Sequence, residues 1–189
     1  MADNNKISYG LKSVYYAVAT IAADGSATYD TPVAFPGAVS LSMAAQGDTN
    51  IFYADNIAYY TSVANNGYEG DLEMAYLPES FLTDVMGNIK ASNDILYEDA
   101  GAEPVHFALL FQFEGDKNAV RHVLYNCVAS RPDVASTTKN ESIEPQTQTI
   151  SITASTVYVA AVDADIPKGR CVEGDTAYST FFTSVVLPT

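Results

Sequence analysis

Residues 106–129, HFALLFQFEGDKNAVRHVLYNCVA, decide the fold class more clearly than any other stretch of the chain. Two runs rich in β-branched and aromatic side chains flank the segment 114–118, EGDKN, which has the composition of a tight loop. Strand-forming residues on both sides of a short polar loop predict an antiparallel hairpin. The β pattern continues in both directions from this hairpin.

Apolar and polar side chains alternate with the period of a strand in several other segments. In one of them, Leu72, Met74 and Tyr76 alternate with Asp71 and Glu73. We expect strands at residues 12–20, 38–43, 69–77 and 146–155, and further strands at 157–162 and 177–186, with a loop that contains Gly169 and Gly174 between the last two. Residues 130–145 have few apolar anchors and are expected to form a mobile loop.

One short helix is predicted within LPESFLTDVMG, residues 77–87. Pro78 suits the first turn, Glu79 complements the helix dipole there, and Gly87 is placed to end the helix. The apolar residues of this segment share one flank, which would pack on a sheet. Because no internal repeat or linker interrupts the pattern, we expect one mainly β domain over residues 1–189.

The charge of the chain limits its partners. The 189 residues carry a formal net charge of −14 and are 48% hydrophobic, which is typical of a globular protein. A strongly negative surface repels phosphates and disfavours a protein that grips nucleic acid or anionic lipid. No apolar run approaches the ~20 residues of a membrane helix, and the first residues lack the pattern of a signal peptide. We therefore expect folding in a cytoplasm, without membrane insertion.

Some residue types have catalytic potential, but they form no familiar catalytic motif. Asp71 and Glu73 would share a strand face roughly 6–7 Å apart, a spacing that could serve glycoside hydrolysis, although a solvated polar face is the favoured interpretation. His122 and Cys127 are an odd number of positions apart on one strand, so alternation predicts opposite faces and no thiol–imidazole pair. Cys127 and Cys171 are expected to be buried free thiols, and a bridge between them is the less favoured alternative. The sequence contains no metal-binding cluster or phosphate loop, and no cofactor or metal is expected.

The segment between residues 44 and 70 combines aromatic residues with Asp, Asn and Gly. It exceeds the ~12–15 residues of an ordinary loop and is expected to form an extended arm or hairpin. Tyrosine suits such an arm, because its ring and hydroxyl tolerate both water and a docked surface. From the pattern alone, packing of these tyrosines in a core and exposure on a binding surface are equally expected.

Several motifs of the chain resemble the major tail protein, or tail tube protein, of long non-contractile-tailed bacteriophages. These motifs are YGLKSVYYA (9–17), PGAVSLSM (36–43), GD (47–48), FYADN (52–56), YY (59–60), NNGYEGDLEMA (65–75), LLFQFEGDKNAVRHVLYNCVASRP (109–132) and SIEPQTQTISITA (142–154). The resemblance keeps the same order through most of residues 8–155 and thins after residue 156.

This resemblance implies a β-sandwich-like domain with a flanking helix and a long loop between strands. Six copies would form a ring, and the rings would stack into a hollow tail tube for genome ejection, without catalysis or a cofactor. The long loop, here about 44–66, would reach the adjacent ring through Phe52, Tyr53, Asp55, Asn56, Tyr59 and Tyr60. The protein would assemble in the host cytoplasm and lie in the virion tail. Its partners would be further copies of itself, a tape measure protein in the lumen, and tail terminator and tail tip proteins.

The residue pattern agrees with a lumen that does not hold DNA. An acidic and hydroxyl-lined wall offers double-stranded DNA no counterion release, so the duplex could pass without tight binding. The candidate lumen residues, which alternate with expected core positions, are Ser40, Ser42, Asp71, Glu73, Thr149, Ser151 and Thr153. Some of these residues could instead face the outer solvent. Unpaired strand edges would be covered by neighbouring copies in a closed ring.

Two other hypotheses stay open from the sequence. A non-catalytic carbohydrate-binding β-sandwich could use Tyr53, Tyr59 and Tyr60 as stacking platforms. A glycosidase could use Asp71 and Glu73. Specific binding on a glycan array would distinguish the first from a tube subunit, and hydrolysis of a polysaccharide would distinguish the second.

Overall fold

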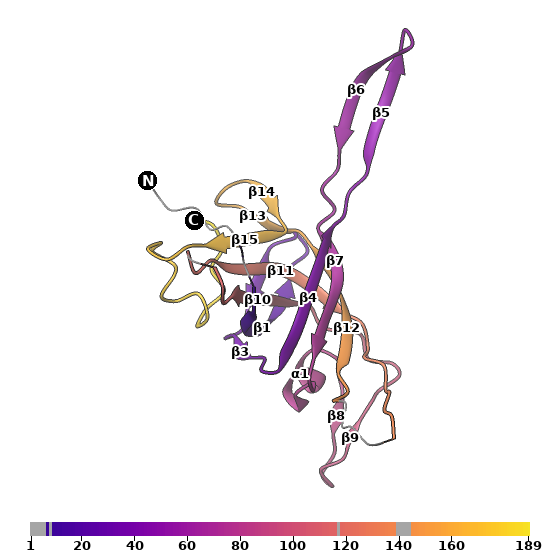
Figure 1. The fold of residues 1–189 in the computed structure, drawn as a ribbon, viewed down its shortest axis with the longest axis vertical. Helices are drawn as coiled ribbons and strands as arrows, with labels where there is room; N and C mark the ends of the chain where they lie inside the picture. Colours follow the sequence, from indigo (N-terminus) through magenta and orange to yellow (C-terminus); the bar gives the residue numbers. More distant parts are fainter. Residues whose placement is uncertain (1–6, 8, 117, 139–144) are drawn as a thin grey trace.

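The computed structural model describes residues 7, 9–116, 118–138 and 145–189, and within these ranges nine strands form one sheet (Figure 1). The main path of the sheet is β2 (Ala27–Tyr29), β1 (Leu11–Ile21), β10 (Phe107–Phe113), β11 (Arg121–Ala129), β12 (Gln148–Ser155), β7 (Tyr68–Met74) and β4 (Ala38–Ala45). In addition, β3 (Val33–Ala34) pairs with β1, and β15 (Lys168–Cys171) pairs with β11. Neighbouring strands are antiparallel. The mainly β fold is therefore confirmed.

The hairpin predicted at residues 106–129 is confirmed as β10 and β11, which pair from Gln112↔Arg121 to Phe107↔Cys127. β-branched and aromatic side chains favour this pairing, and the polar residues between the two strands form the connection. The predicted strands at 12–20, 38–43, 69–77 and 146–155 are confirmed as β1, β4, β7 and β12, with small shifts at their ends.

A bulge in β11 divides the sheet into two leaves. Between the pairs Leu109↔Leu124 and Phe107↔Cys127, β11 contains one residue more than β10. On the edge of β11 away from β10, its first half pairs with β15 and its second half pairs with β12. A bulge bends and twists a strand. The leaf β12–β7–β4 consequently crosses the leaf that contains β1, β10 and β15, as Figure 1 shows.

The same bulge overturns the predicted geometry of His122 and Cys127. The extra residue returns Cys127 to the face that carries Leu124, and both belong to one core cluster. His122 lies on this face too and stacks on Phe111, with 5.2 Å between the ring centroids. The prediction of opposite faces was wrong, because it assumed uninterrupted alternation along β11.

The first core fills the space between the leaves and α1 (Glu79–Asp84). Phe81 of α1 is fully buried, stacks on Phe35 with 4.5 Å between centroids, and meets Tyr16 edge-on at 5.2 Å. The helix begins after Pro78 and ends before Gly87, whose φ of 72° lies in the left-handed region that glycine tolerates. The prediction of one short helix packed on the sheet is confirmed for the described residues.

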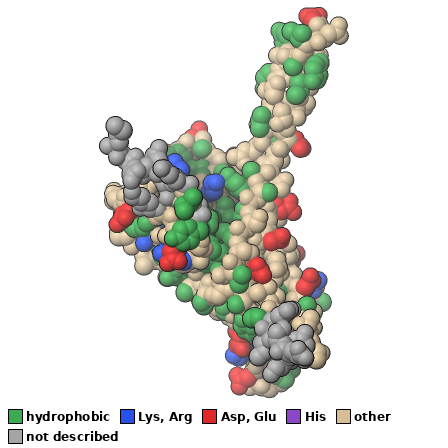
Figure 2. All heavy atoms as spheres, viewed as in Figure 1, with side chains coloured by type: hydrophobic (Ala, Val, Ile, Leu, Met, Phe, Trp, Pro, Cys, Tyr) green, Lys and Arg blue, Asp and Glu red, His purple; other side chains and the backbone are tan. Residues whose placement is uncertain are grey.

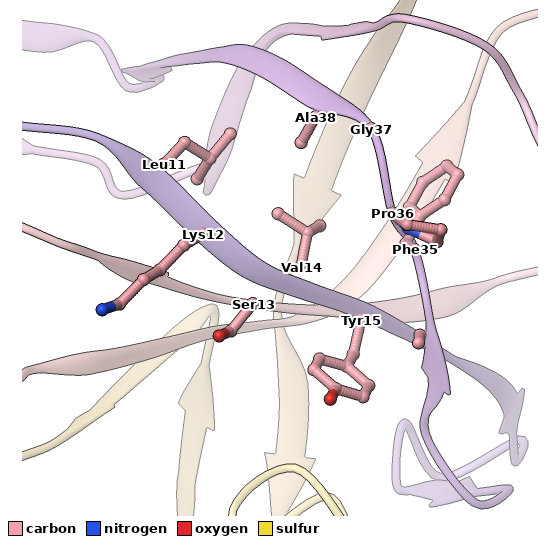
Figure 3. A pocket seen from close by; sticks show the side chains of 10 residues that line it. Leu11, Lys12, Ser13, Val14, Tyr15, Phe35, Pro36, Gly37 and Ala38 are labelled. Carbon is pink, nitrogen blue, oxygen red and sulfur yellow. The ribbon is translucent and has the colours of Figure 1, made fainter.

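The two ends of the sheet approach each other at β1 and β4. A groove of about 290 Å³ lies between β1 and the segment that leads into β4 (Figure 3). Leu11 and Val14 point toward Ala38, whereas Lys12 and Ser13 point away. A register shift in β1 at Ser13, whose φ is 51°, places Leu11 and Val14 on the same side. This closure gives the sandwich- or barrel-like shape that was expected.

The second core lies on the other face of β10 and β11, under the C-terminal segment and the short strands β13 (Val157–Val159) and β14 (Ala164–Ile166). The prediction of a strand at 177–186 is wrong, because residues 177–183 form turns and residues 184–186 are irregular. Side chains anchor the segment in place of a backbone ladder. The guanidinium of Arg121 lies 3.7 Å from the ring centroid of Tyr178 and 4.6 Å from that of Phe182.

The region expected to be a loop around Gly169 contains β15 instead. A Cβ atom on Gly169 would lie 2.6 Å from the hydroxyl oxygen of Tyr125, so the absence of a side chain lets β15 pass over that ring.

The remaining predicted segments are only partly confirmed. The strand predicted at 157–162 is confirmed only as far as Val159. The short strands β8 (Ile89–Lys90) and β9 (Leu96–Tyr97) follow α1. Residues 130–138 contain no strand, and residues 139–144 of the predicted mobile loop lie outside the described residues.

Candidate assembly surfaces

The segment around residues 44–66 forms a hairpin of β5 (Thr49–Ala54) and β6 (Ile57–Val63) that projects far from the body (Figure 1). Its turn residues, Asp55 and Asn56, have φ of 51° and 61°. Two consecutive left-handed residues make a turn whose twist matches an antiparallel pair, and Asp and Asn are among the residues that adopt it. The expectation of an extended arm or hairpin is confirmed.

This β5–β6 hairpin continues the ladder of β4 and β7 beyond the sheet. The amide of Ala64 donates to the carbonyl of Asp48 at 3.0 Å, and the amide of Gln46 donates to the carbonyl of Gly67 at 2.9 Å. These bonds connect the hairpin directly to two strands that are packed in the body. The hairpin therefore has a fixed direction at its base.

The aromatic side chains of the β5–β6 hairpin are exposed and lie outside both cores. The exposed fractions are 62% for Phe52, 64% for Tyr53, 70% for Tyr59 and 64% for Tyr60. Phe52 lies directly opposite Tyr60 across the two strands. Figure 2 shows hydrophobic side chains along the length of the hairpin. An exposed apolar surface of this kind is typical of an interaction site.

The structure brings the seven candidate lumen residues together on one face of the leaf β12–β7–β4, which we call the polar face. Strand pairing arranges them in rows: Ser40–Glu73–Thr149, Ser42–Asp71–Ser151, and Thr153 opposite Glu69. The other face of the leaf contributes Leu72, Met74, Ile150 and Ile152 to the first core. Sequence reasoning missed Glu69, although its spacing from Asp71 and Glu73 would have placed it on the same face.

Hydroxyl groups on the polar face bind the carboxylates beside them. Thr147 donates to Oε1 of Glu73 at 2.6 Å, Ser40 donates to Oε2 at 2.9 Å, and Ser151 donates to Asp71 at 2.7 Å. The hydrogen bonds from Thr147 and then Ser40 lower the pKa of Glu73. The strands β4, β7 and β12 contain no Lys or Arg. The polar face is therefore acidic, and acidic side chains lie over the strands below the hairpin in Figure 2.

The hypothetical catalytic groups have environments that disfavour catalysis. A lowered pKa keeps Glu73 ionised, which is the opposite of what a general acid in glycoside hydrolysis requires. Burial raises the pKa of the Cys127 thiol to about 12, far from the range of a reactive thiolate. Cys127 and Cys171 are both buried free thiols, as expected. Within the described ranges, no cluster of His, Cys, Asp or Glu has the arrangement of a metal site.

Comparison with protein families gives a match over nearly the whole chain. A family model described as phage tail tube protein matches residues 2–184. The chain belongs to the phage tail tube proteins. Its family and its β-rich fold assign it a structural role in the tail of a phage virion, where copies assemble into a tube. Comparison with curated proteins found no significant match. None of the helical segments in the described part of this tail tube protein has the length and hydropathy needed to cross a membrane.

Proposed function

We propose that this tail tube protein, a single domain over residues 1–189, forms hexameric rings that stack into a tube with an acidic bore. The observation that carries the proposal is the projecting β5–β6 hairpin with its exposed aromatic side chains. A two-stranded hairpin is at best marginally stable by itself in water. Contact with the adjacent ring would supply the packing that the hairpin lacks, through Phe52, Tyr53, Asp55, Asn56, Tyr59 and Tyr60.

Burial of these side chains would contribute a substantial part of the free energy of assembly. Full burial of one large apolar side chain contributes roughly 1.5–3 kcal/mol. Each subunit has four exposed aromatic residues on its hairpin, and a ring presents all its hairpins to its neighbour at the same time. Simultaneous engagement of linked sites strengthens association well beyond the affinity of one contact.

Lateral association within a ring is supported by the edge of β4. Within the described part of the chain, β4 ends the sheet order and no strand pairs with its outer edge. Its eight residues, AVSLSMAA, contain neither the lysine nor the proline that often blocks an edge strand. Pairing of this edge with a different surface of the next copy would be a head-to-tail contact, which closes into a ring when the rotation fits.

The polar face supports the assignment of the bore. Glu69, Asp71 and Glu73 lie along β7, and Ser and Thr side chains lie on both neighbouring strands. Duplex DNA gains affinity when cations of a protein release its counterions, and this face supplies no cation. DNA would therefore pass without tight binding. In the same proposal, a tape measure protein occupies the bore before ejection, terminator and tip proteins cover the tube ends, and assembly takes place in the host cytoplasm.

Deletion of the hairpin tests this function. Concentrated wild-type protein is expected to form tubes in negative-stain micrographs. A variant with residues 48–64 replaced by a short glycine linker should keep the circular dichroism of the folded protein but form no tubes, because the described core clusters contain no residue of this segment.

The matched control is Tyr60→Phe, which keeps the aromatic ring and removes only the hydroxyl, and it should still form tubes. Tubes of normal length from the deletion variant would refute the role of the hairpin. A wild-type protein that forms no tubes at any concentration would refute the function itself.

A further inference from the structure

The end of the molecule opposite the β5–β6 hairpin also exposes apolar side chains. Figure 1, with the longest axis vertical, places the hairpin at one end and the β8–β9 connection at the other. The exposed fractions at this distal end are 54% for Ile89, 50% for Ile95, 47% for Tyr97 and 98% for Val134. These exposed Ile, Tyr and Val side chains form a second apolar surface outside the cores.

A cavity of about 580 Å³ opens beside these residues. We call it the distal cavity. It lies between the end of α1, the bases of β8 and β9, and the segment that follows β11. Leu82, Met86, Pro132 and Val134 form the apolar part of its lining, and the other lining residues are polar: Asn88, Glu98, Ser130, Arg131, Asp133 and Gln148. Its size falls within the range of pockets that enclose a ligand, so it has room for more than one side chain.

Contacts beside the distal cavity connect the segments that surround it. Lys90 of β8 pairs with Glu79 of α1 at 2.9 Å, and Arg131 pairs with Glu98 at 2.6 Å. The amide of Asn88 also donates to the carbonyl of Leu82 at 3.0 Å. Exposed ion pairs contribute little stability, but these contacts join three separate segments. A preformed acceptor avoids much of the ordering cost of binding.

We propose that the distal cavity, with Ile89, Ile95, Tyr97 and Val134 around it, receives the tip of the β5–β6 hairpin from a copy in the adjacent ring. The proposal rests on the proposed function, since it requires stacked copies. When identical subunits stack in one direction, one end of each copy meets the opposite end of the next. The two exposed apolar ends would then cover each other.

The apolar character of the distal end favours this acceptor over the polar face. The cations Lys90 and Arg131 of the distal end are already paired with Glu79 and Glu98, so charge does not select it. Its exposed Ile and Val side chains give aromatic rings an apolar surface to bury against, whereas the polar face presents carboxylates and hydroxyl groups. A tip with several aromatic rings is therefore received more favourably at the distal end than on the acidic leaf.

Cross-linking in assembled tubes tests the contact directly. The variant Ala58→Cys/Val134→Cys places one thiol near the hairpin tip and one at the distal cavity, both at exposed positions. Cys127 and Cys171 are buried, so they add little background. After treatment with a short bismaleimide, a denaturing gel should show a ladder of covalent multimers. The control Ala58→Cys/Ser42→Cys, with its second thiol on the polar face, should remain monomeric.

Charge insertion provides a second test that does not depend on thiol geometry. Val134→Asp and Ile95→Asp should abolish tubes in micrographs while leaving the circular dichroism and melting temperature of the monomer unchanged. Val162→Asp, which makes the same change at an exposed residue outside the distal end, should assemble normally.

Tubes that lack the Ala58→Cys/Val134→Cys ladder, or that form normally from Val134→Asp and Ile95→Asp, would overturn this acceptor and leave the tube function standing. Failure of the wild-type protein to assemble would instead overturn the function on which the acceptor depends.

Discussion

Glu73 shows how single residues set the character of the polar face. Its two carboxylate oxygens accept hydrogen bonds from Thr147 and Ser40, which lie on either side of β7. These donors favour the charged form and lower the pKa of Glu73. The hydroxyl-rich composition of the neighbouring strands thus has a physical effect: it keeps the face negative as the pH falls.

Removal of Thr147 as a donor should raise the pKa of Glu73 toward its ordinary value, because Thr147 is the largest cause of the shift. We expect Thr147→Val to raise it more than Ser40→Ala does, as measured by NMR titration of the Glu73 side chain. Thr153→Val, opposite Glu69, serves as the control and should leave Glu73 unchanged.

The sign of the pH effect on stability follows from the same shift. A carboxyl group whose pKa is lower in the folded state stabilises the fold at pH values above its unfolded pKa, and this contribution is lost as the pH falls through the folded pKa.

The NMR titration of Thr147→Val also has an outcome that would contradict the assigned hydrogen bond: an unchanged pKa of Glu73.

At the scale of elements, α1 is held by its one fully buried aromatic side chain. The ring of Phe81 contacts three aromatic rings: Tyr16 of β1, Phe107 of β10, and Phe35, which follows β3. A helix of six residues is thereby fixed to parts of the chain that are distant in sequence. Such a short helix has little stability of its own, since nucleation is costly. Packing against the sheet, and not helix propensity, determines its position.

Phe81→Ala should lower the free energy of unfolding by about 3–5 kcal/mol, because it removes a buried ring and leaves a cavity. Chemical denaturation of the unassembled protein measures the change. Thr83→Ala, on the same helix, loses the exposed hydrogen bonds from its hydroxyl to Ser80 and Asp84 and should cost about 1 kcal/mol or less. Equal losses for the two variants would show that Phe81 does not anchor α1.

At the scale of the whole molecule, the structure separates three surfaces in space. The β5–β6 hairpin and the β8–β9 connection lie at opposite ends of the long axis, and the leaf β12–β7–β4 runs between them (Figure 1). The distal cavity lies beside the β8–β9 connection, and the polar face covers one side of the leaf. An elongated subunit with different ends and an acidic side is suited to directional stacking around a bore.

Charge reversal on the polar face should convert the tube into a DNA-binding one. Tubes of Glu69→Lys/Asp71→Lys are expected to retain double-stranded DNA at low salt and release it at high salt, because lysines release counterions on binding phosphate. Retention of labelled DNA by pelleted tubes measures the effect. Asp30→Lys/Glu103→Lys changes the net charge equally, at exposed residues elsewhere, and should retain much less. Equal retention by both variants would argue against a bore lined by the polar face.

The sequence by itself determined the elements whose signal is local. Alternation along β4, β7 and β12 identified both the buried face of the leaf and its polar face, because successive side chains of a strand point to opposite sides. The same local chemistry identified the β10–β11 hairpin, the short helix between Pro78 and Gly87, and an arm in the aromatic segment.

Only the tertiary structure decided features that depend on distant partners. The bulge in β11 placed His122 and Cys127 on the same face, where the sequence predicted opposite faces. Gly169 is part of a strand because β15 pairs with β11, and its lack of a side chain leaves room for the Tyr125 ring. Residues 177–186 have a strand-like composition, yet Arg121 and the core beneath them hold them as turns and irregular backbone. The separation of the hairpin from the distal cavity was equally invisible in the sequence. Local pattern fixes which face of an element is apolar, whereas the path of the chain between elements fixes where that face is buried or left exposed.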